Sequence, residues 1–195
     1  MSEAPETGFA ELVAATNYSF LRGASHPAEM VAEAINLGMK GIGIADRNSV
    51  AGVVRAWAFL KEQQVKKPEV VEGFRLVVGA RLVFADGTPD IVAYPVSRHG
   101  WGRLTRLLSV GNLQAQKGDC ILSLEDLLGH CEDLLLIAME GDEELLRTLK
   151  RARPKSVWLA ATMPQSGTDA RRLAKLQHLS AATGVPLLAT NDALY

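Results

Sequence analysis

The feature that most constrains the fold of this chain is a series of seven short apolar runs separated by longer amphipathic segments. The runs cover residues 9–15, 41–45, 76–84, 90–94, 134–138, 157–161 and 186–190. Continuous apolar runs of this kind are typical of parallel strands that helices cover on a sheet. The pattern therefore predicts an α/β protein with a largely parallel sheet of seven strands.

Helical signals lie between these runs. Pro27 and Gly38 bound the first predicted helix, and a capping box of Ser123 and Asp126 begins a later one. The apolar stripe predicted for the second helix consists of Val50, Val53, Val54, Trp57 and Leu60. Further helices are predicted around 101–108, 142–151 and 169–183. Strands and helices in strict alternation fit a closed (β/α) barrel or an open doubly wound sheet, and the absence of a GxGxxG or GxxxxGK[ST] loop favours the barrel.

Composition limits the domain organisation and the class of protein. A chain of 195 residues with 48% apolar content can bury one substantial core, so one globular unit is expected after a polar leader at 1–8. The 21 basic and 22 acidic residues argue against a surface that is basic as a whole and selected for nucleic acid. Two cysteines, no signal peptide and no membrane-spanning run predict a cytoplasmic protein.

Candidate functional residues are those that directly follow the strands, because both architectures place their sites at the carboxyl ends of strands. These residues are Thr16, Asn17, Asp46, Arg47, Glu140, Asn191 and Asp192. Asp46 and Asp192 are expected to converge at the barrel mouth. Carboxylates alone suit hard cations, and catalytic zinc or manganese sites usually add histidines, which none of these strand ends carries. The four histidines and Ser19 are interpreted as surface, capping or turn residues.

Several motifs together resemble a known family. They include "ATNYSFLRGAS" (15–25), "GIGIADRNSVAGVVRA" (41–56), "VVGARLVF" (77–84), "GWGRLTRLLSVGN" (100–112), "KGDCILSLEDLL" (117–128) and "GVPLLATNDALY" (184–195). The resemblance, over residues 9–195, is to the amino-terminal PHP domain of bacterial C-family DNA polymerases, closest to the error-prone alpha-subunit paralogue. It implies a distorted seven-stranded (β/α) barrel, truncated here, at the head of a polymerase whose core would lie beyond Tyr195.

Metal-binding members of that family, which hold zinc or manganese, carry histidines and acids at positions that can be compared one by one. The corresponding positions in this sequence are Val13, Ala15, Arg22, Asp46, Arg47, Arg81, Asn191, Asp192 and Leu194. Val13, Ala15, Arg47 and Leu194 stand where the family has histidine. Asp46 and Asp192 are the only ligands kept, so we expect a degenerate site with no catalytic metal and no cofactor in this fragment.

The same alignment yields a structural hypothesis and a rival to it. In the first, Arg22, Arg47 and Arg81 compensate the charges of Asp46 and Asp192 in place of metal ions. In the second, the arginines bind a phosphate of a nucleic acid or a pyrophosphate.

The resemblance implies a PHP domain of an error-prone DNA polymerase that works in translesion synthesis and DNA repair. The domain itself is expected to be structural and catalytically silent, because the magnesium-dependent polymerase core is absent. Partners implied for the whole enzyme are the rest of its chain, primer-template DNA, the sliding clamp and proteins of a mutagenesis complex. The alternatives are a metal-dependent phosphoesterase or 3′-5′ exonuclease, and a freestanding interaction module.

Overall fold

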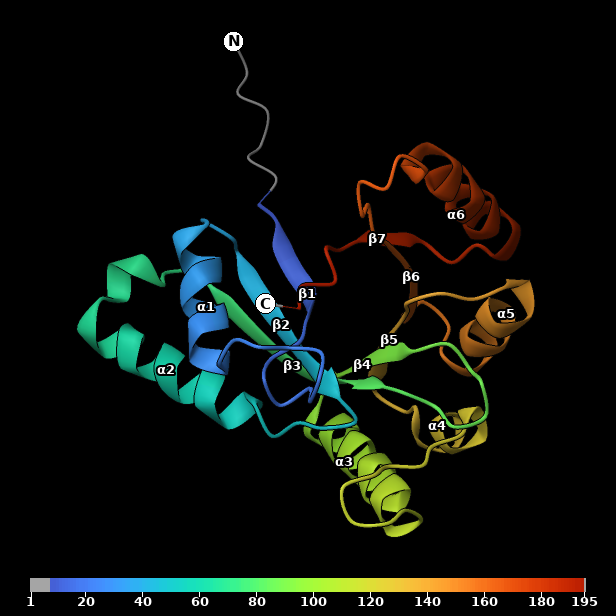
Figure 1. Cartoon of the computed structure of the whole chain (residues 1–195), viewed down its shortest axis with the longest axis horizontal. Helices are drawn as coiled ribbons and strands as arrows, with labels where there is room; N and C mark the ends of the chain where they lie inside the picture. Colours follow the sequence, from blue (N-terminus) through green and yellow to red (C-terminus); the bar gives the residue numbers. More distant parts are fainter. Residues whose placement is uncertain (1–7, 195) are drawn as a thin grey trace.

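The computed structural model of this chain describes residues 8–194, so Tyr195 and all but the last residue of the predicted leader lie outside the described part. One sheet contains β1 (Ala10–Ala14), β2 (Gly41–Arg47), β3 (Arg75–Leu82), β4 (Ile91–Pro95), β5 (Leu134–Ala138), β6 (Val157–Ala161) and β7 (Leu187–Ala189), in that spatial order. The helices are α1 (Pro27–Asn36), α2 (Val53–Lys66), α3 (Arg98–Leu113), α4 (Leu124–His130), α5 (Glu143–Ala152) and α6 (Asp169–Thr183), with the 3-10 turn η1 (Pro68–Val70) after α2. Every predicted strand and helix is confirmed (Figure 1).

The predicted strict alternation and largely parallel pairing are wrong at one strand. β4 runs antiparallel to both β3 and β5, whereas the other neighbouring strands pair in parallel. The segment from residue 83 to residue 90 is too short for a crossover helix, because a parallel connection needs about a dozen residues or more. It turns back at Gly87, whose φ is 86°. The amino end of β4 therefore lies at the same edge of the sheet as the carboxyl ends of the other strands.

The sheet curls into a half-barrel whose two edges meet just beyond β7. Ala14 and Ala193 form an isolated parallel bridge, with hydrogen bonds from Ala15 N to Ala193 O (2.8 Å) and from Ala193 N to Val13 O (2.9 Å). Figure 1 shows this last segment running beside β1. The distorted seven-stranded barrel is thus confirmed, although a short bridge and not a full strand ladder joins its edges.

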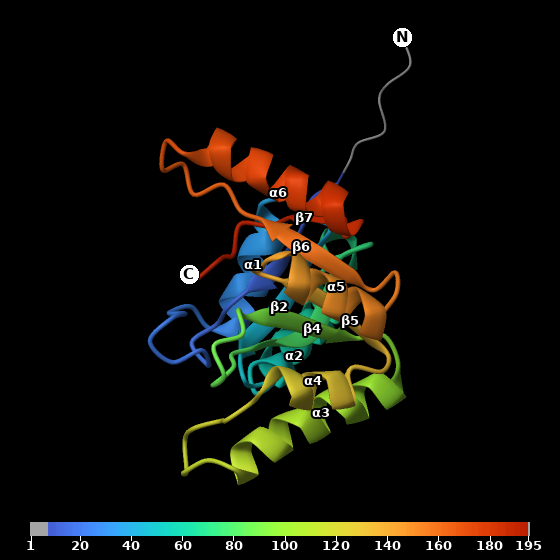
Figure 2. The ribbon, with the colours of Figure 1, turned by 90° about the vertical axis from the view of Figure 1, so that its right-hand side faces the viewer.

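Apolar side chains fill both sides of the curled sheet. Helices α1 and α2 cover the first three strands and α3–α6 cover the others, as the two ribbon views show (Figures 1 and 2). Inside the barrel, Val13 packs with Val92, Tyr94 and Ile137. A Cβ on Gly79 would lie 2.5 Å from Cδ1 of Tyr94, so the glycine makes room for this ring. Burial, together with the charges of Glu11 and Asp46, raises the pKa of Tyr94 far above its usual value.

The stripe predicted for α2 is wrong for Val54 and Trp57, and the error concerns which face of the helix is buried. Ala56 and Leu60 face the core, whereas Val54 and Trp57 are exposed and Val50 precedes the helix. The prediction combined residues from two sides of one helix. By contrast, the predicted capping box of Ser123 and Asp126 is confirmed by two reciprocal hydrogen bonds. Within residues 8–194, no helix is long and apolar enough to cross a bilayer.

Candidate functional site

The first part of the barrel mouth is built around Asp46, at the end of β2. This carboxylate is fully buried and accepts hydrogen bonds from Thr16 N (2.7 Å) and Ser19 Oγ (2.7 Å) at Oδ1, and from Thr16 Oγ1 (2.9 Å) at Oδ2. A Cβ on Gly52 would lie 2.6 Å from Oδ2, so a glycine allows the backbone before α2 to pass close to the carboxylate. Asp46 thus anchors the loop that follows β1.

The ion pairs predicted for Asp46 are not present among the described residues. Arg47 is exposed, and its backbone N–H donates to Ser19 Oγ (3.0 Å), while its guanidinium has no hydrogen bond or ion pair with any residue from 8 to 194. Arg22 approaches a different carboxylate, with Nη1 3.5 Å from Asp90 Oδ2. Backbone and hydroxyl donors already occupy the oxygens of Asp46, so no arginine contacts it.

The second part of the mouth is an ion network centred on Arg81 of β3. This residue is 7% exposed; its Nε donates to Asp90 Oδ2 (2.7 Å) and its Nη1 to Asp192 Oδ1 (2.6 Å). Asp90 precedes β4 and Asp192 follows β7, so one guanidinium links three separate segments of the mouth. Of the three arginines expected to compensate Asp46 and Asp192, Arg81 is thus the one that pairs with Asp192, and Asp90 is an additional partner that the sequence did not indicate.

Asp90 and Glu11 are two residues that the sequence analysis missed, and each leaves a weak signal in the sequence. Asp90 could have been found from the short connection before it, which requires a hairpin and brings the start of β4 to the mouth. Glu11 is a lone acid in an apolar strand. It is buried, with Oε1 accepting from Val13 N (2.7 Å) and Thr190 Oγ1 and Oε2 accepting from Asn191 N (2.8 Å). Glu11 thereby stabilises the closure of the barrel.

The other four positions compared with the family hold side chains that lie outside the hydrogen-bonded groups of the mouth. Val13 and Ala15 are buried apolar residues, Asn191 is exposed, and Leu194 is half-buried. None of these four side chains joins the hydrogen-bonded groups of the mouth; Asn191 contributes its backbone N–H only. Val13 instead belongs to the apolar interior cluster.

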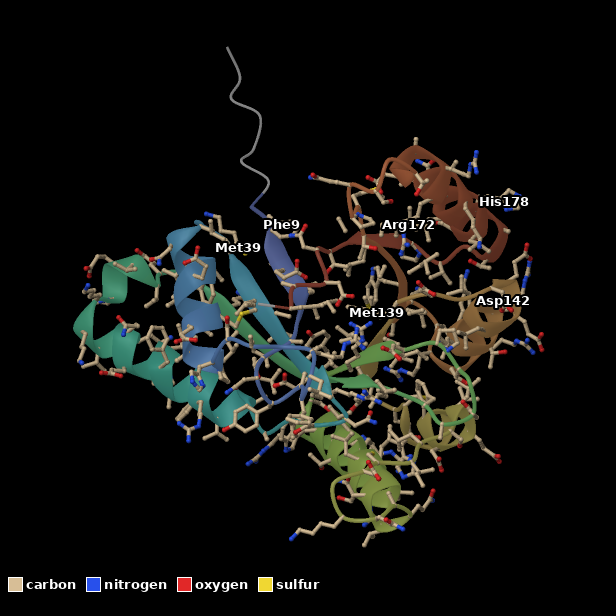
Figure 3. The ribbon with its side chains drawn as sticks, viewed as in Figure 1. Phe9, Met39, Met139, Asp142, Arg172 and His178 are labelled. Atoms are coloured by element: carbon tan, nitrogen blue, oxygen red, sulfur yellow. The ribbon has the colours of Figure 1, made fainter. Side chains whose placement is uncertain are left out.

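A cleft of about 290 Å³ opens beside the Arg81 network. It is lined by Arg81, Pro89, Asp90, Met139, Glu140, Thr162, Arg172 and Asp192. Arg172 of α6 enters from the far side and donates from Nη2 to Thr162 Oγ1 (3.0 Å). Figure 3 labels Met139 near the middle of the barrel and Arg172 on the side of α6 toward the sheet, with His178 on the outer side of that helix. The cleft is therefore a mixed surface of acids and arginines with no imidazole.

These residues do not fit a centre of two or three metal ions. Within the described range 8–194, no three His, Cys, Asp or Glu side chains are grouped so that they could hold a metal. Asp46 already accepts hydrogen bonds from three neutral donor groups, and a guanidinium lies between Asp90 and Asp192, where it would repel a divalent cation. Catalytic zinc sites need three protein ligands and an open position, which this mouth does not offer.

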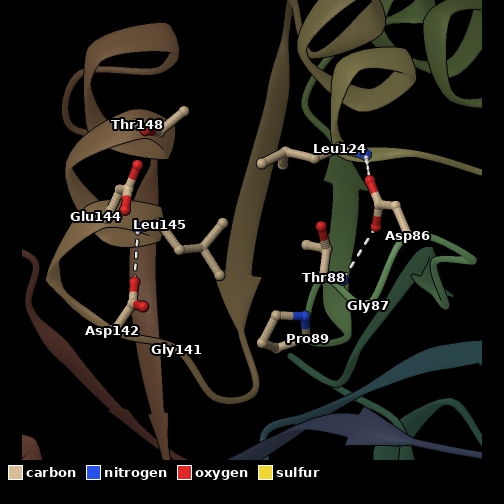
Figure 4. Close-up of a pocket in the computed structure, with 10 residues that line it drawn as sticks. All are labelled: Asp86, Gly87, Thr88, Pro89, Leu124, Gly141, Asp142, Glu144, Leu145 and Thr148. Atoms are coloured by element: carbon tan, nitrogen blue, oxygen red, sulfur yellow. Dashed lines mark hydrogen bonds between the residues drawn. The ribbon is translucent and has the colours of Figure 1, made fainter.

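A second cleft, of about 330 Å³, lies between the β3–β4 hairpin and the start of α5 (Figure 4). Two of its acidic side chains accept hydrogen bonds from backbone amides. Asp86 accepts from Leu124 N (2.8 Å) and Thr88 N (3.0 Å), and Asp142 accepts from Leu145 N (3.0 Å). Burial raises the pKa of Asp86, but the hydrogen bonds from Leu124 and Thr88 outweigh it and hold the pKa below its usual value. We therefore assign these carboxylates to capping and turn formation.

The curled seven-stranded sheet, with its acids and arginines at the mouth, defines a domain of the distorted (β/α)-barrel class, and comparison with known families gives the same class. The profile of the PHP domain family matches residues 11–163, so the chain belongs to the PHP domain family. Among curated relatives it is 52% identical to error-prone DNA polymerase 1 of Rhizobium meliloti over 195 residues, 48% to the error-prone DNA polymerase of Rhodopseudomonas palustris, also over 195, and 44% to that of Caulobacter vibrioides over 194. Each alignment covers 96% of this chain but 17% of the relative. The chain therefore spans about one sixth of the length of these relatives.

Solved structures with the same fold are more distant in sequence. A candidate metal-dependent phosphoesterase from Bifidobacterium adolescentis superposes with a TM-score of 0.61 at 15% identity, covering 98% of this chain and 90% of that one. An amidohydrolase from Chromobacterium violaceum gives a TM-score of 0.59 at 14% identity, covering 95% and 87%. At such low identity these likenesses establish the fold alone.

Proposed function

We propose that this chain is the PHP domain of an error-prone DNA polymerase and that it serves that enzyme as a structural part without hydrolytic activity. Identities of 44% to 52% over nearly the whole chain to polymerases of that name support the first statement. The enzyme as a whole would synthesise DNA across lesions in the cytoplasm, with magnesium in its polymerase core. Its partners would be primer-template DNA, the sliding clamp and other mutagenesis proteins, and the PHP domain would contact the rest of the chain.

The observation that carries the second statement is the position of Arg81. Hydrolysis of a phosphoester by a metal-bearing barrel requires ions that activate water and stabilise the leaving oxygen. At this mouth a guanidinium, held by Asp90 and Asp192 at 2.7 and 2.6 Å, supplies the positive charge instead. A guanidinium does not lower the pKa of a bound water in the way that a coordinated zinc ion does. The arginine can therefore hold the three segments together, as ions would, but it leaves the site without their chemistry.

The test combines elemental analysis with a nuclease assay. The purified 195-residue protein is expected to contain no stoichiometric zinc or manganese and to leave a 3′-mismatched primer intact in the presence of either ion. Stoichiometric metal together with cleavage that disappears in Asp46→Ala and Asp192→Ala variants would favour the phosphoesterase or exonuclease instead. The polymerase assignment is tested separately, by the DNA synthesis of the full-length chain on a lesion-containing template with magnesium.

A further inference from the structure

Helix α2 has a second apolar face that points away from the core. Val54, Trp57 and Val65 are 69%, 53% and 84% exposed, and Ala58 and Lys61 are exposed beside them. Contiguous apolar patches of this kind on a protein surface commonly mark interaction sites. Val54 and Trp57 belong to the apolar stripe predicted for this helix, but both side chains are exposed to solvent.

The spacing of these residues makes one continuous stripe along the helix. At 3.6 residues per turn, positions 54, 58, 61 and 65 fall within about 60° of one another, with Trp57 at one side. Ala56 and Leu60, which face the core, lie on the opposite side of the helix. A helix that is apolar on two opposite faces is typical of one buried between two layers. Among residues 8–194, the core covers one face of α2, and the other face is exposed.

The charges on this stripe indicate what can cover it. Lys61 is its single charged residue, and its Nζ lies 5.8 Å from the centroid of the Trp57 ring. Two neighbouring side chains already have partners, because Arg55 Nε donates to the neutral hydroxyl of Tyr18 (3.0 Å) and Lys66 forms an ion pair with Glu62. Lys61 forms no ion pair with any residue from 8 to 194, so an acid on the surface that packs against Trp57 and Val65 would compensate its charge.

A second copy of the chain fits this stripe poorly. Antiparallel self-pairing centred on residues 54–65 would place the two Lys61 side chains within about one helical turn of each other. The stripe itself carries no acid that could separate these like charges. Relatives of this chain, in contrast, are polymerases of which the matched region is 17%, so most of their length lies outside it.

We propose that the outward face of α2 packs against another part of the same polymerase chain, on an apolar surface that carries an acidic residue opposite Lys61. This proposal rests on the proposed function, since it requires the domain to be part of the longer enzyme. The contact follows the helix-in-groove mode, in which residues spaced three and four apart along one helix face act as anchors. Trp57 is the central anchor, because a large aromatic side chain contributes most to such an interface.

Hydroxyl-radical footprinting with mass spectrometry tests the contact at single residues. The oxidation rate of Trp57 is compared between the 195-residue protein and the full-length polymerase, with the partly exposed Trp101 of α3 as the internal reference. We expect the rate at Trp57 to fall several-fold in the full-length enzyme relative to Trp101. Equal rates at Trp57 in the two proteins would overturn the proposal, as would protection that appears only after primer-template DNA is added.

A pair of matched substitutions separates docking from folding. Val65→Lys is expected to restore oxidation of Trp57 and to lower the thermal midpoint of the full-length enzyme, with no change in the midpoint of the 195-residue protein. Val96→Lys makes the same chemical change at an exposed valine between β4 and α3 and should alter neither protein. If Val65→Lys leaves the footprint and the midpoint of an active polymerase unchanged, the docking face is wrong while the proposed function stands. A full-length chain without DNA synthesis would instead count against the proposed function.

Discussion

Asp46 and Asp192 lie at the same edge of the barrel, yet the protein neutralises them in different ways. Asp46 is fully buried and, among residues 8–194, its side chain accepts hydrogen bonds only from Thr16 and Ser19. Asp192 is partly exposed and binds the guanidinium of Arg81, which Asp90 also binds. The difference follows from the segments that lie near each carboxylate. The loop after β1 brings an amide and two hydroxyl groups to Asp46, whereas the hairpin before β4 brings another acid toward Asp192.

The comparison shows that, in a barrel mouth without histidines, different groups can stabilise different carboxylates, so no single group has to take the place of metal ions. Neutral donors suffice for a carboxylate that sits under a tight loop, since hydrogen bonds to a charged group contribute about 1.5–3 kcal/mol each. Two carboxylates that face each other need a cation, because like charges at short range repel. The two halves should therefore respond differently when their donors are removed.

The largest effect is expected from Arg81→Leu. The substitution leaves Asp90 and Asp192 facing each other without a cation, and removing one partner of a largely buried ion pair typically costs about 3 kcal/mol or more. Urea unfolding of the 195-residue protein, followed by circular dichroism, measures the loss in free energy of unfolding.

A neutral version of the same half provides the control. Adding Asp90→Asn and Asp192→Asn to Arg81→Leu removes the repulsion and should recover a large part of the lost stability. If the triple variant is no more stable than Arg81→Leu, the cost comes from lost packing of the arginine side chain and not from the unpaired carboxylates.

A smaller effect, about 2 kcal/mol, is expected from Asp46→Asn. The amide keeps one acceptor oxygen for Thr16 N and Ser19, but its NH₂ group turns a donor toward the Thr16 hydroxyl. The same urea titration measures this loss. Because the two halves share no hydrogen-bond partner, the double variant with Arg81→Leu should show additive losses within about 0.5 kcal/mol. A coupling larger than that would mean that the mouth is one network and that the comparison fails.

Ser19→Ala should cost about 1.5 kcal/mol, the lower end of the range for a hydrogen bond to a charged group. It removes one donor to Asp46 and leaves Arg47 N without its acceptor, since both bonds use Ser19 Oγ. Ser49→Ala is the matched control, because its hydroxyl accepts an exposed bond from Ala51 N (3.1 Å) and should contribute little. Equal losses for the two serine variants, measured by chemical unfolding, would argue that Asp46 does not depend on the loop donors.

Most of the fold could be predicted from the sequence, because most strands are apolar runs and several helices carry their own capping residues. Pairing direction at β4 could not be read from that pattern, since an apolar run looks the same in a parallel and in an antiparallel strand. The length of the connection before Asp90 was the better guide. On α2 the pattern was ambiguous, because Val54 and Leu60 both look like core residues, although they lie about 120° apart around the helix and only Leu60 is buried.

Several residues of the candidate site could be identified from the sequence, but the contacts between them could not. The strand-end rule located Asp46 and Asp192, and the family alignment located Arg81. Which cation meets which carboxylate depends on side-chain reach and on the local path of the loops. The sequence holds no signal that Ser19 lies closer to Asp46 than Arg47 does, because that arrangement results from the turn after β1.

The smallest effect is expected from Arg47→Ala, and it bears most directly on how the mouth is compensated. The residue next to Asp46 in sequence invited the hypothesis that its guanidinium neutralises that carboxylate. In the structure the side chain is exposed and has no partner among residues 8–194, so its removal should change the free energy of unfolding by less than about 0.5 kcal/mol. Parallel urea titrations of Arg47→Ala and Arg81→Leu provide the measurement. A loss at Arg47 comparable to that at Arg81 would show that in solution the guanidinium reaches the carboxylate, and that both halves of the mouth depend on arginine.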